Sequence, residues 1–212
     1  MPALRRIALV LFVAVAGLLA GLWFARQQEP TPLVLEHATL FPAPRALPGF
    51  ELLDHAGRPF RPERLAGRWS ILFFGFTQCP DVCPSTLAAL AAARRELADL
   101  PPAQQPAVVL VSVDPARDTP ERLAGYVRFF DESFTGVTGE PAALAALTRE
   151  LGVAVLVGEA DENGQYTIDH TATLFLVNPE GALAAVFGTP HSPDGIAHDY
   201  RLILARSAGE DW

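Results

Sequence analysis

The most restrictive feature of this sequence is the segment that carries its only two cysteines. A short apolar run, Ile71 to Phe74, precedes Cys79 and Cys83, and an alanine-rich stretch begins at Pro84. The apolar run is typical of a buried strand, and the stretch that follows favours a helix with Pro84 in its first position. A strand, a loop with two thiols and a helix are therefore expected in succession, with Cys83 at the helix cap.

The chemistry of this loop depends on the state of its thiols. A helix start at Cys83 predicts a lowered cysteine pKa, because helix N-termini favour thiolate over thiol. Two neighbouring thiolates are soft donors that suit Cu(I) or Zn(II). The spacing is Cys-x-x-x-Cys, whereas a thioredoxin-type redox centre has Cys-x-x-Cys. The loop indicates a metal site, a disulfide between Cys79 and Cys83, or the two in alternation.

An uninterrupted apolar run from Ile7 to Phe24 indicates a membrane span near the N-terminus. Arg5 and Arg6 precede the run, so the positive-inside rule predicts a cytoplasmic N-terminus and an exported domain. The alternative is a signal peptide cleaved after the small residues 14–16. Because such cleavage would leave much of the run unused, we expect residues 1–26 to form an uncleaved single-pass anchor in the bacterial inner membrane. The periplasm is oxidising, so paired cysteines there readily form disulfides.

Charge and composition exclude several classes of function. The net charge of −8 argues against a nucleic-acid partner. The sequence contains no lysine, which excludes a Schiff-base lysine and a P-loop lysine. Hydrophobic residues make up 50% of the chain, which is ample for the core of one globular domain.

The chain after the anchor is expected to form a linker and one domain. Residues 27–45 are rich in proline and lack periodicity, which predicts a semi-extended linker. Residues 46–212 alternate strand and helix signals, which favours a three-layer α/β domain with a mixed central sheet. We expect strands at 50–53, 69–75, 107–113, 153–157, 165–168, 174–177 and 182–187, and helices at 84–100, 119–130, 141–151 and 192–206. Asn163-Gly164 predicts a β-hairpin between the fourth and fifth of these strands.

Two thiolates rarely complete a metal site, so a third donor is expected among the histidines. His170 directly precedes the apolar strand at 174–177, and in a thioredoxin-like arrangement the residues entering that strand pack against the cysteine loop. We therefore favour His170, with Asp169 beside it as an outer-shell or steering carboxylate. The alternative is a hydrogen-bonded histidine at a hairpin end. The remaining histidines are expected at ordinary surface positions: His37, His55, His191 and His198.

Acidic residues in three other motifs have mainly structural interpretations. Asp114-Pro115 ends a strand and is interpreted as a turn. Asp118 to Glu121 is interpreted as a helix start capped by Thr119. Asp81, between the thiols, is either a solvated turn carboxylate or a group that steers a cationic partner.

Four stretches of the sequence together resemble the Sco/SenC proteins, which are membrane-anchored copper-binding factors of cytochrome c oxidase assembly. The stretches are Gly75 to Pro84, Val111 to Pro115, Arg117 to Pro120, and Asp169 to Thr171. The likeness covers about residues 46–206, and the predicted anchor and linker agree with the layout of that family.

The resemblance implies a thioredoxin-like fold with an extra β-hairpin and a copper site formed by Cys79, Cys83 and His170. Two thiolates and an imidazole suit Cu(I), and the imidazole also suits Cu(II). The implied function is that of a metallochaperone rather than an enzyme, delivering copper to the dinuclear centre of cytochrome c oxidase subunit II. A copper donor and a thiol reductant in the same compartment complete the implied partners.

Two other functions stay open beside the chaperone. A thiol–disulfide reductase would use Cys79 and Cys83 as a redox-active pair that keeps the cysteines of a target reduced. The fold favours this function, whereas the spacing of the cysteines weighs against it. The other alternative is a peroxidase or a redox or copper sensor.

Overall fold

The computed structural model describes residues 2–27 and 33–209, which fall into two units. The first contains the helix α1 (Pro2–Gln27), and the second is an α/β domain that begins at Leu35. Within α1, the segment Arg5–Trp23 is long and apolar enough to cross a membrane. The helix expected from the N-terminal apolar run is therefore present.

The domain is built on an eight-stranded sheet with the strand order β1-β10-β9-β4-β5-β6-β2-β3. Strands β4, β5 and β6 are parallel neighbours, and the other pairs are antiparallel. The strands are β1 (Ala38–Ala46), β2 (Leu52–Asp54), β3 (Pro59–Phe60), β4 (Ser70–Gly75), β5 (Ala107–Ser112), β6 (Thr135–Thr138), β9 (Leu174–Val177) and β10 (Ala182–Phe187). This mixed sheet confirms the predicted fold class.

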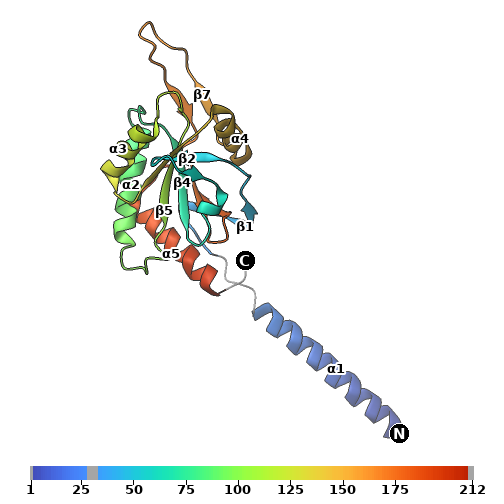
Figure 1. Cartoon of the computed structure of the whole chain (residues 1–212). Coiled ribbons are helices and arrows are strands. Elements are labelled where there is room, and N and C mark those ends of the chain that lie inside the picture. The colour runs from blue at the N-terminus through green and yellow to red at the C-terminus, as the bar shows by residue number, and fades with distance from the viewer. Residues whose placement is uncertain (1, 28–32, 210–212) are drawn as a thin grey trace. The chain divides into compact units, whose positions relative to one another are not determined.

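Helices cover both faces of the sheet (Figure 1). On one face, α2 (Val82–Glu96) packs against α5 (Pro193–Gly209) and α3 (Pro120–Phe130), while α4 (Pro141–Leu151) lies on the other. The short 3-10 turn η1 (Pro62–Arg64) follows β3. Every residue of β4 is buried, so the strand that leads into the cysteine loop is the centre of the core.

A separate two-stranded ribbon stands outside the main sheet. It pairs β7 (Val155–Val157) with β8 (Ile168–His170) in antiparallel register. The loop between them contains the predicted Asn163-Gly164 turn, in which Gly164 has a left-handed φ of 74°. The hairpin is therefore confirmed, and β8 ends at His170.

The structure also corrects several predicted element boundaries. The bounds of the strands at 174–177 and 182–187 and of the helix at 141–151 are confirmed. Helix α2, however, begins at Val82 rather than Pro84, so Cys83 lies inside its first turn. The first N–H groups of a helix lack partners in any case, so Pro84 is tolerated in the third position as well as in the first. Strands β3 and β6 were not predicted.

The linker predicted over residues 27–45 is wrong in its second half. Residues 38–46 form β1, an edge strand that pairs with β10. An edge strand needs hydrogen bonds on one side only, and the register shifts between Leu40 and Arg45, where Pro42 and Pro44 lie. The prolines that indicated a linker are therefore compatible with a strand. Residues 28–32 lie outside the described residues.

One buried carboxylate fixes the start of β1. Asp199 of α5 is fully buried and accepts hydrogen bonds from the backbone N–H groups of Glu36, His37 and Ala38 at 3.2, 2.7 and 2.7 Å. Because three donors converge on one carboxylate, the domain begins at an ordered segment rather than at a free linker.

Replacing Asp199 with alanine should lower the free energy of unfolding by about 3 kcal/mol, because several N–H groups lose a charged acceptor inside the protein. Urea denaturation of the purified protein measures the change. Asp99→Ala is the control, since this exposed carboxylate pairs with Arg201 in solvent and should contribute little. Equal stability of the Asp199→Ala variant and the parent would contradict the role of the carboxylate.

Candidate metal centre

The structure brings Cys79, Cys83 and His170 together from two separate parts of the chain. Their donor atoms all lie within 4.8 Å of one another, and Cys83 Sγ lies 3.4 Å from Nε2 of His170. Among the residues that the structure describes, these three form the one cluster of histidine, cysteine and carboxylate donors close enough to hold a metal ion. The expected convergence of the three side chains is thus present.

The two cysteines differ in exposure and in their backbone contacts. Cys79 lies in the turn after β4 and is partly exposed, whereas Cys83 is fully buried in the first turn of α2. The backbone N–H of Cys83 donates to the sulfur of Cys79 at 3.4 Å. The N-terminus of α2 therefore faces the Cys79 sulfur, while the Cys83 sulfur points into the protein.

Burial has the largest effect on the pKa of the Cys83 thiol. Loss of solvation raises the pKa of its thiol far above the ordinary value, and a backbone hydrogen bond with Phe76 offsets only part of this rise. The pKa lowering expected from the helix start is therefore wrong for Cys83, because burial outweighs the helix N-terminus. A cation at the site would supply the charge that stabilises the thiolate.

His170 is held in the tautomer that a metal requires. Its Nδ1 lies 3.1 Å from the carbonyl oxygen of Thr171, and because a carbonyl only accepts, Nδ1 is the protonated nitrogen. The lone pair of Nε2 then faces Cys83. Burial lowers the pKa of His170, so the ring is neutral at neutral pH. Asp169 was expected in the outer shell, but its side chain is exposed and the carbonyl of Thr171 takes that place.

Two phenylalanines from the central strand and its end support the histidine ring. The rings of Phe73 and Phe76 contact His170 edge-on, with centroid distances of 6.1 and 5.9 Å. An open cavity of about 300 Å³ lies on the exposed side of the site, next to Cys79 and His170. The site is therefore packed on its inner side and accessible on its outer side.

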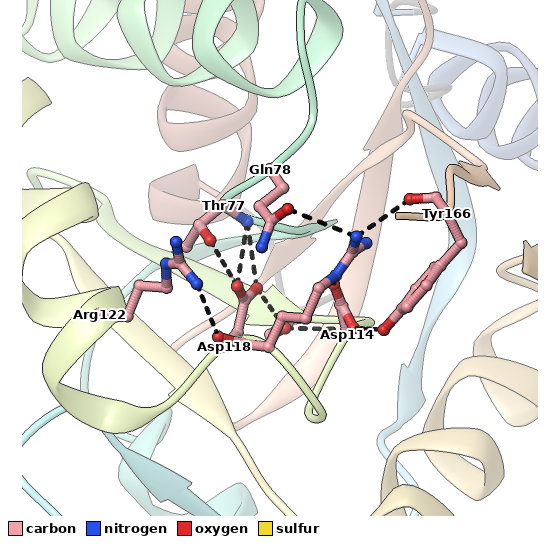
Figure 2. Close-up of polar contacts among 8 residues, drawn as sticks. Thr77, Gln78, Asp114, Asp118, Arg122 and Tyr166 are labelled. Carbon is pink, nitrogen blue, oxygen red and sulfur yellow. Dashed lines mark hydrogen bonds and ion pairs between the residues drawn. The ribbon is translucent and has the colours of Figure 1, made fainter. Parts of the chain in front are cut away.

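Asp118 shapes the beginning of the cysteine loop (Figure 2). This buried carboxylate accepts hydrogen bonds from the backbone N–H and the hydroxyl of Thr77 at 3.1 and 2.5 Å, and from the hydroxyl of Ser112 at 2.7 Å. Thr119 caps α3 as predicted, since its side chain accepts from the N–H of Arg122. Asp118 itself thus has a role that the interpretation as a helix cap missed.

Asp114 and Tyr166 form a second polar group beside the loop (Figure 2), and Arg117 hydrogen-bonds both. Asp114 is buried and accepts from Arg117 Nε and from the hydroxyl of Tyr166. Arg117 in turn donates to Gln78, the residue before Cys79. The interpretation of Asp114 as a simple turn residue was therefore incomplete. The only signal in the sequence for this ion pair was that Asp114 lies three residues before Arg117. The contact of Asp114 with Tyr166 could not be predicted, because it depends on the tertiary fold.

The remaining histidines do not belong to the donor cluster. His55 Nδ1 accepts from the N–H of Gly136, and His191 Nε2 donates to the carbonyl of Ala172. His198 is exposed on α5, and the backbone of His37 binds Asp199. Among the five histidines, only His170 lies beside the thiols.

Comparisons with known proteins agree with this geometry. The SCO1/SenC family profile matches residues 41–205. A relative from Stutzerimonas stutzeri is 41% identical over 167 residues, which are 78% of this chain and 80% of its own length. Human protein SCO2 homolog, mitochondrial, is 34% identical over 209 residues, covering 96% of this chain and 77% of that protein. The crystal structure of Arabidopsis thaliana ScoI with copper bound is 32% identical, with a TM-score of 0.69, and the match covers 74% of this chain and 98% of that chain.

The absence of a side chain at Gly75 makes room for the Cys83 sulfur, because a Cβ atom there would lie 2.9 Å from it. Gly75→Ala should displace this sulfur and lower the free energy of unfolding by about 1 to 3 kcal/mol. Urea denaturation measures the stability, and the rate of alkylation of Cys83 in a Cys79→Ser background measures the displacement. Gly125→Ala is the control, since that helical position has open space around it. If neither quantity changes with Gly75→Ala, the sulfur does not need this space.

Proposed function

This chain belongs to the SCO1/SenC family, and we propose that it is a membrane-anchored copper chaperone. The observation that carries the proposal is the convergence of two sulfurs and one imidazole nitrogen within 4.8 Å. This donor set is soft enough for Cu(I), and the imidazole also suits Cu(II). Cys79, Cys83 and His170 would hold the ion, which is the cargo of the protein. The copper-bound Arabidopsis relative of the same fold supports this assignment.

Copper transfer would proceed by exchange of ligands on the exposed side of the site. Cys83 is buried and His170 is supported by two rings, whereas Cys79 is partly exposed beside the 300 Å³ cavity. A donor side chain of the partner would enter through this cavity and bind the ion before Cys79 leaves it. The ion would then pass to the partner without release into solution. By family membership we propose the dinuclear copper centre of cytochrome c oxidase subunit II as the recipient.

Copper loading requires reduced cysteines. Metal binding needs deprotonated thiols, and a disulfide between Cys79 and Cys83 would remove both sulfur donors. Both cysteines are free in the structure, but the proposed compartment is oxidising. A thiol reductant and a copper donor in the same compartment are therefore the other proposed partners.

A thiol–disulfide reductase is the second candidate function, and one observation favours it. The two sulfurs lie within 4.8 Å of each other, and Cys79 is exposed enough to attack a disulfide. In that reaction Cys79 and Cys83 would be oxidised to a disulfide while the disulfide of the target is reduced to two thiols. A mixed disulfide trapped between a Cys83→Ser variant and its target would support this second function.

We propose that α1 anchors the protein in the bacterial inner membrane, with the N-terminus in the cytoplasm and the domain in the periplasm. The apolar length of Arg5–Trp23 and the two arginines at its start support this orientation. A domain held at the outer surface of that membrane could meet an oxidase subunit that projects from it.

Replacing Cys79 or Cys83 with serine should abolish tight binding of copper, because a hydroxyl is a poor ligand for Cu(I). Copper per chain is measured after anaerobic loading of the reduced protein and removal of excess metal. His170→Ala should weaken binding more mildly, since both thiolates stay, and the exposed His198→Ala variant serves as control. Full copper occupancy in the Cys83→Ser variant would contradict the proposed site.

The full chain, expressed in a Gram-negative bacterium, should fractionate with the inner membrane. Its domain should be digested by protease added to intact spheroplasts, because the domain faces the periplasm. Immunoblots against a C-terminal tag follow the digestion, and a cytoplasmic protein serves as the control for lysis. Protection of the domain in intact spheroplasts would contradict the proposed orientation.

A further inference from the structure

The ribbon that carries His170 has few polar ties to the rest of the domain. Strands β7 and β8 pair only with each other and not with the main sheet. The hydrogen bonds that join residues 155–170 to the rest of the described domain are made by His170, with Cys83 and Thr171, and by Tyr166. Beyond the contacts of His170 itself, the polar ties of the ribbon to the rest of the described domain are those of Tyr166.

Arg117 holds Tyr166 by two kinds of contact. Its Nη1 donates to the backbone carbonyl of Tyr166 at 3.0 Å, and its guanidinium carbon lies 3.6 Å from the centroid of the Tyr166 ring. The hydroxyl of Tyr166 donates to Asp114 at 2.7 Å, and Arg117 Nε donates to the same carboxylate. The side chain and backbone of Tyr166 are thus both bound to the Asp114–Arg117 ion pair.

The same arginine contacts the cysteine loop. Nη1 lies 3.4 Å from the amide oxygen of Gln78, which precedes Cys79. The guanidinium also lies 5.8 Å from the centroid of the Phe76 ring, which contacts His170 in turn. Only 14% of the Arg117 side chain is exposed, so these contacts are made in a partly desolvated place where they are stronger than in water.

We propose that Arg117 is a positioning residue that holds the His170 ribbon against the cysteine loop and thereby sets how fast the site releases copper. It is not one of the three donors, but it is the one described side chain that hydrogen-bonds both segments. The part of this inference that concerns copper depends on the proposed function, whereas the part that concerns the ribbon does not. Lysine could keep the ion pair with Asp114, but its point charge lacks the planar fork and the stacking on Tyr166.

Two measurements on the full chain test this role. Hydrogen exchange of the metal-free protein follows the amides of residues 155–170, and a chelator in excess measures the dissociation rate of copper. Arg117→Gln should still bind one copper ion per chain, because all three donors remain. Copper should leave it about tenfold faster, the effect of losing about 1.4 kcal/mol, and the ribbon amides should exchange faster. Arg117→Lys should give intermediate values.

Arg201→Gln is the matched control, because it removes another arginine–aspartate pair, the one with Asp99, which follows the end of α2 opposite to Cys83. It should leave both rates at the values of the parent. A folded Arg117→Gln variant with unchanged ribbon exchange and unchanged copper release would overturn the proposal. If the parent binds no copper, the proposed function fails, and the exchange of the ribbon amides alone decides the role of Arg117.

Tyr166→Phe is a second variant that tests the same role if Arg117→Gln does not fold. This change removes only the hydroxyl that donates to Asp114 and keeps the ring under the guanidinium. It should accelerate ribbon exchange and copper release in the same direction, but less than Arg117→Gln. Parental values of both rates in this variant would contradict the proposal.

Discussion

The contact of 3.4 Å between Cys83 Sγ and His170 Nε2 is the constraint on which the rest of the site depends. It joins the first turn of α2 to the last residue of β8, and a local feature of the structure favours the position of each partner. Gly75 leaves space for the sulfur, and the carbonyl of Thr171 selects the tautomer of the imidazole. Strand β4 lies next to both groups, since Gly75 leaves room for the sulfur and Phe73 packs on the imidazole.

The site combines a buried, packed inner side with an accessible outer side. Cys83 lies in the core and the ring of His170 packs on Phe73 and Phe76, whereas Cys79 borders an open cavity. A storage site would be expected to enclose all its donors. A site that must pass its ion to another protein needs one donor that can be displaced, and the exposure of Cys79 meets that need.

The sequence was sufficient for the fold class and for the cysteine loop, because both depend on local signals. The apolar run before Cys79 and the Asn163-Gly164 turn can each be recognised in a single segment. His170 was favoured only through the expected thioredoxin-like arrangement and the resemblance to the Sco/SenC proteins, because its own segment also fits a hydrogen-bonded histidine. The edge strand β1 could not be predicted, because its prolines are tolerated only through pairing with β10. The raised pKa of Cys83 and the contacts of Arg117 also escaped prediction, since burial and the meeting of Gln78 with Tyr166 are products of the tertiary fold.

X-ray absorption at the copper edge, recorded on the reduced protein after loading with Cu(I), tests the central claim most directly. The account predicts a low-coordinate ion with two sulfur neighbours and one imidazole nitrogen, and the loss of the nitrogen in the His170→Ala variant. A spectrum with sulfur neighbours only, unchanged in that variant, would show that His170 is not a ligand. A spectrum without sulfur would contradict the site as a whole.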